Sequence, residues 1–174
     1  PIGDKRNNKI FSAEELSSIH DFYDAQTDFV LKQLDELLGE LLYECKSNQT
    51  AVIITADHGE EFFEHNDFGH RPKMIEELIH VPLWIHTPDQ VGTQNVYDGV
   101  TSHLDIAPTI SDLFGYKPDD HWKGHSLMSS LEFESESIRN CAISELSHRE
   151  GLGGEVRPDE IIISIRKTEW KYIL

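Results

Sequence analysis

The chain has 174 residues, of which 38% are hydrophobic, so it is long enough for one core with a small additional layer. Its 32 acidic residues outnumber its 15 basic residues, which gives a formal net charge of -17. Because nucleic acids and anionic membrane surfaces repel such a chain, we expect neither as a partner. The two cysteines, Cys45 and Cys141, lie far apart in the sequence, which argues against a disulfide framework and a cysteine-rich metal site.

Targeting and membrane segments are absent from the sequence. No apolar run approaches the roughly 18 residues that indicate a membrane-spanning helix, and no signal-peptide pattern is present. The chain begins with Pro1 rather than Met, so we expect the natural amino terminus to be missing. The cellular location therefore stays open, with the cytoplasm only as the default.

The first predicted element is a long helix over residues 13–44. Ser12 and Glu15 form an S-x-x-E capping box in front of it. Apolar residues then recur at helical spacing from Leu16 to Leu42, which predicts an amphipathic helix that packs against a sheet.

A short run rich in β-branched residues, 51–56, follows and predicts a strand buried on both faces. Asp57, His58 and Gly59 come directly after it, at the carboxyl end of the strand, where open α/β sheets bind ligands. A loop is predicted over 59–74. The loop holds further groups able to bind a metal or transfer a proton, namely Glu60, Glu61, Glu64, His65, Asp67, His70 and Lys73. Strand ends are polar in most α/β proteins, so this pattern alone leaves open a merely solvated edge.

The remaining predictions concern residues 80–174. They are a second buried strand within 80–87, a loop over 88–100, a helix from a capping signature at Ser102 and Asp105 to Gly115, an acidic connection over 129–140, a strand over 141–146, a flexible loop over 147–160 and a β-hairpin over 161–174. Three histidines near these elements, His80, His86 and His103, are expected to be surface or packing residues.

The order of strand, Asp-His-Gly, His-rich loop, Glu-Glu and second strand resembles the sulfatase family of the alkaline phosphatase superfamily. The resemblance extends to "YDA" at 23–25, "HLDIAPT" at 103–109, "GHSL" at 124–127 and the terminal "KYI". It implies an α/β fold with a mainly parallel sheet flanked by helices, plus a small antiparallel carboxyl-terminal sheet. We divide the chain accordingly into residues 1–140, part of the α/β core, and residues 141–174, a small β subdomain.

The resemblance also implies a site and an activity, the hydrolysis of sulfate esters. Asp57 and His58 would bind a divalent metal, and His70 would contact the ester, either as a proton donor or as an imidazolium that holds its oxygens. Because an imidazole stands beside the aspartate, we favour Mn or another transition metal over Ca, with Mg and Zn also open.

One part of the family pattern is missing. Sulfatases carry a C-x-P-x-R or S-x-P-x-R segment whose Cys or Ser becomes a formylglycine nucleophile, and neither this segment nor the amino-terminal Asp pair is present here. The resemblance thus covers only the carboxyl-terminal portion of a sulfatase, and formylglycine is expected only in the missing amino-terminal part. We expect this chain alone to be inactive and, because a truncated sheet exposes apolar edges, to self-associate.

Two alternatives remain open at this point. The same fold serves phosphodiesterases, phosphonate monoester hydrolases and phosphoglycerol transferases, for which the substrate would be a phosphate or phosphonate ester. The third possibility is a non-catalytic binding module that keeps the fold.

Overall fold

The computed structural model describes residues 11–44, 50–88, 96–132, 138–149 and 156–174. The chain divides into two compact units, Pro1–Gly92 and Thr93–Leu174, which are treated separately below. The boundary that the sequence predicted between residues 140 and 141 stays a prediction.

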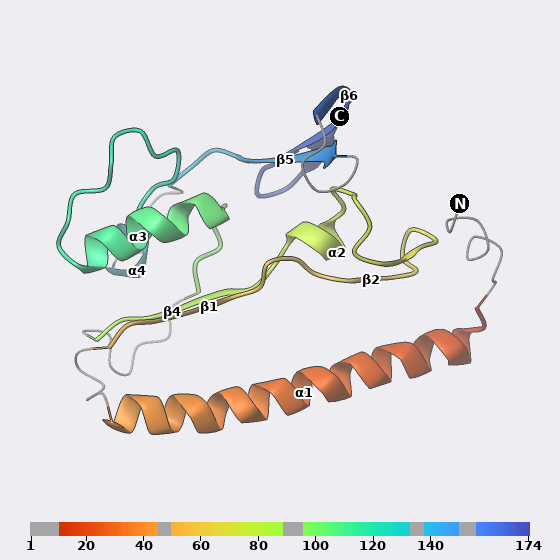
Figure 1. Cartoon of the computed structure of the whole chain (residues 1–174), viewed down its shortest axis with the longest axis horizontal. Helices are drawn as coiled ribbons and strands as arrows, with labels where there is room; N and C mark the ends of the chain where they lie inside the picture. The colour runs from red at the N-terminus through yellow and green to blue at the C-terminus, as the bar shows by residue number, and fades with distance from the viewer. Residues whose placement is uncertain (1–10, 45–49, 89–95, 133–137, 150–155) are drawn as a thin grey trace. The chain divides into compact units, whose positions relative to one another are not determined.

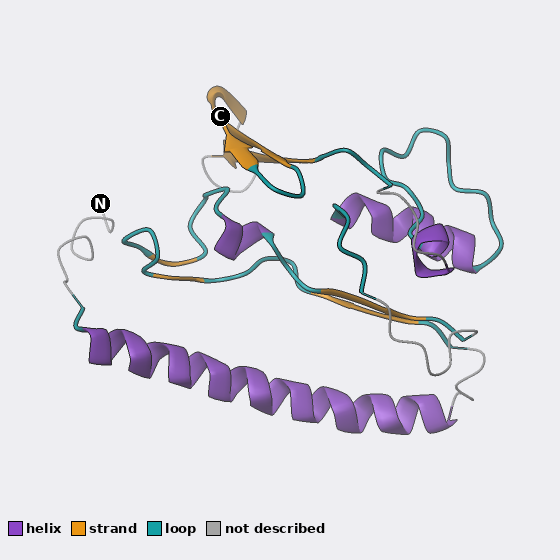
Figure 2. Cartoon of the chain, turned by 180° about the vertical axis from the view of Figure 1, so that it is seen from behind, coloured by secondary structure: helices purple, strands orange, loops and turns teal. Residues whose placement is uncertain are grey.

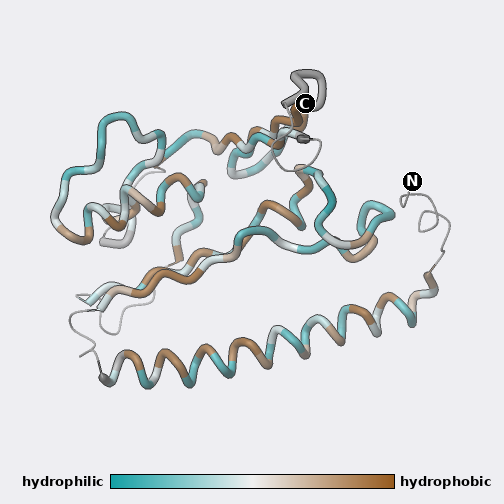
Figure 3. The backbone as a smooth tube through the Cα atoms, in the orientation of Figure 1, coloured by the Kyte–Doolittle hydropathy of each residue, from teal (hydrophilic) through white to brown (hydrophobic). Residues whose placement is uncertain are grey.

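The first unit begins with α1, Ala13–Glu44, over the range predicted from the sequence (Figure 1). Both hydrogen bonds of the predicted capping box are present. The Ser12 N–H donates to Glu15 Oε2 at 2.9 Å, and the Glu15 N–H donates to Ser12 Oγ at 3.2 Å. Apolar residues recur along the whole helix (Figure 3). Tyr23 packs against Phe62 with ring centroids 4.7 Å apart, which joins α1 to the segment that follows β1.

The two predicted strands of this unit are β1, Val52–Thr55, and β4, Leu83–His86. They pair antiparallel, from Val52 opposite His86 to Thr55 opposite Leu83 (Figure 2). The sequence did not predict the direction in which these two strands pair. A parallel pair needs a long crossover connection, usually a helix, and the segment between these strands folds into a hairpin and one short helix instead.

Burial in β1 also differs from the sequence prediction. Val52, Ile53 and Ile54 are half-buried and Thr55 is exposed, where the apolar run predicted a strand buried on both faces. Among the described residues every strand pair is antiparallel, and none of these residues forms a parallel neighbour of β1.

The predicted loop over 59–74 contains structure that the sequence did not reveal. Strands β2, Glu61–Phe62, and β3, Phe68–Gly69, form a small antiparallel hairpin, and α2, Glu76–Ile79, follows it. The turn of the hairpin is closed by the Phe63 N–H, which donates to the Asp67 carbonyl at 2.8 Å. Its apolar side is covered by Phe11, whose ring lies 4.9 Å from that of Phe68.

The second unit contains the predicted helix and the predicted carboxyl-terminal sheet. Its elements are η2, His103–Asp105, α3, Ile106–Leu113, α4, Met128–Glu132, β5, Ala142–Arg149, β6, Val156–Arg166, and β7, Lys171–Ile173. The capping box of Ser102 and Asp105 is formed, and the helix ends before Gly115, whose φ of 73° is the left-handed value expected of a helix-terminating glycine.

Asp105 holds this unit together from a fully buried position. Its carboxylate accepts the N–H groups of Ser102 and His125, each at 2.8 Å, and pairs with the guanidinium of Arg139. Asp105 therefore ties the start of the helix to two later segments of the chain.

Strands β5, β6 and β7 form an antiparallel sheet in that order, which confirms the small carboxyl-terminal sheet. The terminal hairpin is closed by the Lys167 N–H, which donates to the Trp170 carbonyl at 2.8 Å. Three boundaries differ from the predictions. The strand predicted to end at 146 continues to Arg149, and β6 begins at Val156 inside the loop predicted over 147–160, because Arg149 pairs with Val156. The helix α4 occupies the start of the predicted acidic connection. The rest of that connection, 133–137, and the predicted loop residues 150–155 lie outside the described residues.

Candidate metal and ester site

The site begins where β1 ends and the chain turns at Gly59. The Gly59 N–H donates to the Leu78 carbonyl at 2.9 Å, so the backbone of α2 lies directly against the turn. A Cβ atom at position 59 would overlap the carbonyl oxygen of Glu77. A glycine is required here because two backbone segments approach more closely than a side chain permits.

The hairpin of β2 and β3 brings His70 back to the end of β1. Because Glu61 pairs with Gly69, the next residues outward, Glu60 and His70, lie opposite each other. The Nδ1 atom of His70 is 3.2 Å from Glu60 Oε2. The imidazole rings of His70 and His58 face each other, with centroids 4.4 Å apart and planes inclined by 31°. Two of the three residues that the sequence nominated are thus in contact.

Asp57, the third nominated residue, lies at the solvent edge of this pair. Its side chain is 90% exposed, its Oδ1 accepts the His58 N–H at 3.0 Å, and its Oδ2 is 3.8 Å from His58 Nε2. A carboxylate oxygen and an imidazole nitrogen at this separation can bind the same divalent cation with small side-chain rotations. The two side chains therefore fit the metal that the family resemblance implies, and their roles stay predictions.

Glu60 is the residue that sequence reasoning did not single out. One donor atom from each of His58, Glu60 and His70 lies within 4.8 Å of the others. The sequence offered Glu60, Glu61 and Glu64 without distinguishing them. The pairing of β2 with β3 does so, because it turns Glu60 toward His70 and Glu61 toward the interior.

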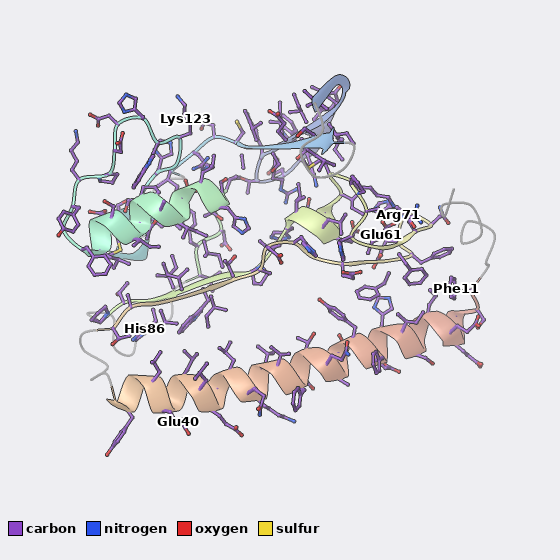
Figure 4. All side chains as sticks on the ribbon, in the orientation of Figure 1. Phe11, Glu40, Glu61, Arg71, His86 and Lys123 are labelled. Carbon is purple, nitrogen blue, oxygen red and sulfur yellow. The ribbon has the colours of Figure 1, made fainter. Side chains whose placement is uncertain are left out.

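A buried ionic network supports the hairpin from inside. Glu61 is completely buried, and its Oε2 lies 2.5 Å from Lys73 Nζ, while its Oε1 accepts the His65 N–H at 3.1 Å (Figure 4). Lys73 Nζ also lies 3.2 Å from Asp67 Oδ2, and Arg71 Nε lies 3.2 Å from Asp67 Oδ1.

The pKa values of two groups respond to this network. Burial alone would raise the pKa of Asp67, but hydrogen bonds from the Phe68 N–H and Lys73, and the charges of Lys73 and Arg71, outweigh it and lower the pKa overall. Burial would lower the pKa of Lys73, and its hydrogen bonds and charge interactions with Glu61 and Asp67 raise it instead. Both groups thus keep their charges at neutral pH.

Comparison with known proteins identifies the family. The model of the sulfatase family matches residues 6–116. The chain belongs to the sulfatase family. It is 31% identical over 170 residues to arylsulfatase K of Bos taurus, covering 94% of this chain and 30% of the bovine protein.

Solved structures of sulfatase-like proteins share its fold. The phosphonate monoester hydrolase of Agrobacterium radiobacter matches with a TM-score of 0.79 and 30% identity over 94% of this chain and 34% of that chain. The protein BT4656, solved in complex with its substrate D-glucosamine-2-N,6-O-disulfate, matches with a TM-score of 0.68 and 26% identity over 82% of this chain and 28% of that chain. These matches confirm an alkaline phosphatase-like α/β fold.

Two further facts bound the interpretation. The chain spans about a third of the length of the relatives it matches. In the described residues, no helix is both long and apolar enough to cross a membrane.

Proposed function

We propose that this chain forms part of a metal-dependent hydrolase of sulfate esters, in which Asp57 and His58 hold a divalent cation and His70 contacts the ester. The observation that carries the proposal is the contact of the His58 and His70 rings at the end of β1, 4.4 Å between centroids. A divalent cation bound there would supply positive charge to the ester oxygens and lower the pKa of a coordinated nucleophile.

His70 is held in one orientation by its partner. An ionised carboxylate only accepts hydrogen bonds, so the contact with Glu60 Oε2 at 3.2 Å assigns the proton to His70 Nδ1. The Nε2 atom is then the atom that faces a substrate. When His70 is an imidazolium, its Nε2–H holds the ester oxygens or protonates the leaving oxygen, and both roles suit a side chain that is 62% exposed.

The nucleophile is proposed to come from residues outside this chain. These 174 residues contain no C-x-P-x-R or S-x-P-x-R segment from which formylglycine would form. We therefore expect the chain alone to turn over no aryl sulfate. Measurable turnover by the purified 174-residue chain would contradict this part of the proposal.

A phosphate or phosphonate ester is the second candidate substrate. The likeness to the phosphonate monoester hydrolase of Agrobacterium radiobacter, 30% identical with a TM-score of 0.79, favours it. Assays of the natural polypeptide that contains this chain, with an aryl sulfate and an aryl phosphonate monoester in parallel, distinguish the two. Turnover of neither ester, with no binding of Mn²⁺ or Ca²⁺, would instead support a non-catalytic binding module.

The residue assignments are tested in that same natural polypeptide. Asp57→Asn is expected to weaken the binding of the divalent cation. His70→Gln is expected to lower turnover by about 10²- to 10⁴-fold, the range for loss of a proton-transfer group. His80→Gln is the matched control, because His80 is 75% exposed and pairs only loosely with Glu76, at 3.6 Å. Equal activity of the His70 and His80 variants would remove His70 from the proposal.

A further inference from the structure

We propose that one face of the β5–β6–β7 sheet binds a second copy of this chain and forms the interface of a symmetric dimer. This surface, called the exposed face below, consists of Ile143, Glu145, Ile163, Ile165, Lys167, Trp170, Tyr172 and Leu174. The sequence predicts self-association through exposed sheet edges, whereas this surface is a sheet face. The inference is independent of the proposed function, because it uses no residue of the candidate site.

The register of the three strands decides which side chains share this face. Side chains alternate between the two sides along a strand, and residues directly opposite each other in an antiparallel pair point to the same side. Ile165 of β6 lies opposite both Ile143 of β5 and Tyr172 of β7. These three residues therefore form a row across the middle of the exposed face.

Two further rows flank this middle row, and each contains one charged side chain. Two residues further along from Ile165, Lys167 lies opposite Trp170, and its Nζ atom lies 5.4 Å from the centre of the Trp170 ring. Two residues before Ile165, Ile163 lies opposite both Glu145 and Leu174. The exposed face thus has a positive charge in one outer row and a negative charge in the other, with apolar residues between them.

The two sides of the sheet differ in exposure. On the exposed face, the side chains of Ile143, Tyr172 and Leu174 have relative exposures of 60%, 55% and 64%. Ser164 points to the opposite side and is only 1% exposed, so the opposite side is already covered at that position. Large apolar side chains gathered on one accessible face are typical of an interaction surface.

Local charge favours this face over α1 as the contact between two copies. The helix α1 also exposes apolar side chains, but it carries nine acidic residues and one lysine, so two copies of it repel each other. Residues 161–174 instead carry three basic residues and one acidic residue, namely Arg166, Lys167, Lys171 and Glu169. In a chain with a net charge of -17, a second copy meets less repulsion here.

The two charged rows select one of the two ways in which identical sheet faces pack around a two-fold axis. An axis along the strands would place Lys167 against Lys167 of the second copy. An axis across the strands at Ile165 reverses the strand direction, so each outer row lies over the opposite outer row of the second copy. Lys167 then lies beside Glu145 of the second copy, and Trp170 lies over Leu174 of the second copy, and both contacts occur twice. Charge complementarity therefore favours the axis across the strands.

The first test is sedimentation equilibrium of the 174-residue chain over a range of micromolar concentrations. We expect a monomer–dimer equilibrium. Tyr172→Lys should weaken the dimer by at least about 30-fold, the loss typical of a central interface side chain. Tyr116→Lys is the matched control, because Tyr116 is 71% exposed in the same unit but lies outside the sheet, and it should leave the equilibrium unchanged. Circular dichroism checks that each variant keeps its fold.

Reversal of the two charges tests the orientation. Lys167→Glu and Glu145→Lys should each weaken the dimer by about 10-fold, because each places like charges side by side twice in the dimer. The double variant should recover most of the affinity. Tighter association of Lys167→Glu would instead support the axis along the strands and overturn the proposed arrangement.

Three results would overturn the inference as a whole. They are a monomer at every concentration, equal effects of Tyr172→Lys and Tyr116→Lys, and a double charge variant that associates no better than the single variants. None of these results bears on ester turnover by the natural polypeptide, so the proposed function is judged separately.

Discussion

Replacing Lys73 by Met tests whether the buried ion pair beneath the site holds the hairpin. Lys73 Nζ lies 2.5 Å from Oε2 of the fully buried Glu61 and 3.2 Å from Asp67. After the substitution, the buried Glu61 carboxylate keeps one of the partners named above, the N–H of His65. Removing one partner of a buried pair costs about 3–5 kcal/mol. Because 27% of the Lys73 side chain is exposed and water can partly replace it, we expect a loss of about 3 kcal/mol.

Urea denaturation of the 174-residue chain, followed by circular dichroism, measures this loss. With a slope of about 2 kcal/mol per M, the midpoint should fall by roughly 1.5 M. Lys117→Met is the control, since the ion pair of Lys117 with Asp120 joins two side chains that are each 80% exposed and contributes at most about 1 kcal/mol. Equal midpoints for the two variants would refute the reasoning.

Three further substitutions or conditions probe the same account by urea denaturation. Gly59→Ala should lower the free energy of unfolding by at least about 2 kcal/mol, because the new Cβ would overlap the Glu77 carbonyl oxygen. Gly39→Ala is the control, since its position on α1 is open and alanine should raise the free energy of unfolding by about 0.5–1 kcal/mol. Equal effects of the two substitutions would contradict the close approach at Gly59. Arg139→Met should lower the free energy of unfolding by about 3 kcal/mol, because it removes the positive charge that pairs with the buried Asp105 carboxylate. A change near zero would show that this ion pair does not stabilise the fold. The pKa of Asp67 is lower in the folded state than its unfolded value of 3.8, so its stabilisation is present above 3.8 and is lost as the pH falls through the folded-state pKa. Asp67→Asn should therefore reduce the decrease in the free energy of unfolding that acid causes. An unchanged decrease in the variant would contradict this role of Asp67.

Much of the local structure follows from short-range signals in the sequence. The capping boxes at Ser12 and Ser102 and the helical spacing of apolar residues predicted α1 and α3 because these features act within a few residues. The direction of strand pairing did not follow in the same way. An apolar run predicts a strand but not the direction of the strand that pairs with it. That direction depends on the segment between the two strands, which for β1 and β4 contains the hairpin of β2 and β3 and the short helix α2.

The candidate site was predicted as individual residues and not as an arrangement. The Asp-His-Gly pattern nominated Asp57 and His58, and the family resemblance added His70. The two-residue strands β2 and β3 are too short to give a periodic signal, so the sequence could not place Glu60 opposite His70. Glu61 was equally hidden, because a glutamate is expected at the surface unless a partner such as Lys73 accompanies it inside.

The most direct test of the central claim is the metal-dependent hydrolysis of an aryl sulfate by the natural polypeptide that contains this chain, compared with its Asp57→Asn and His70→Gln variants. We expect turnover that a chelator abolishes and added Mn²⁺ or Ca²⁺ restores. We also expect turnover by the His70→Gln variant to fall by about 10²- to 10⁴-fold and turnover by the His80→Gln variant to stay unchanged. Full turnover in both the Asp57 and the His70 variants would contradict the assignment of this site.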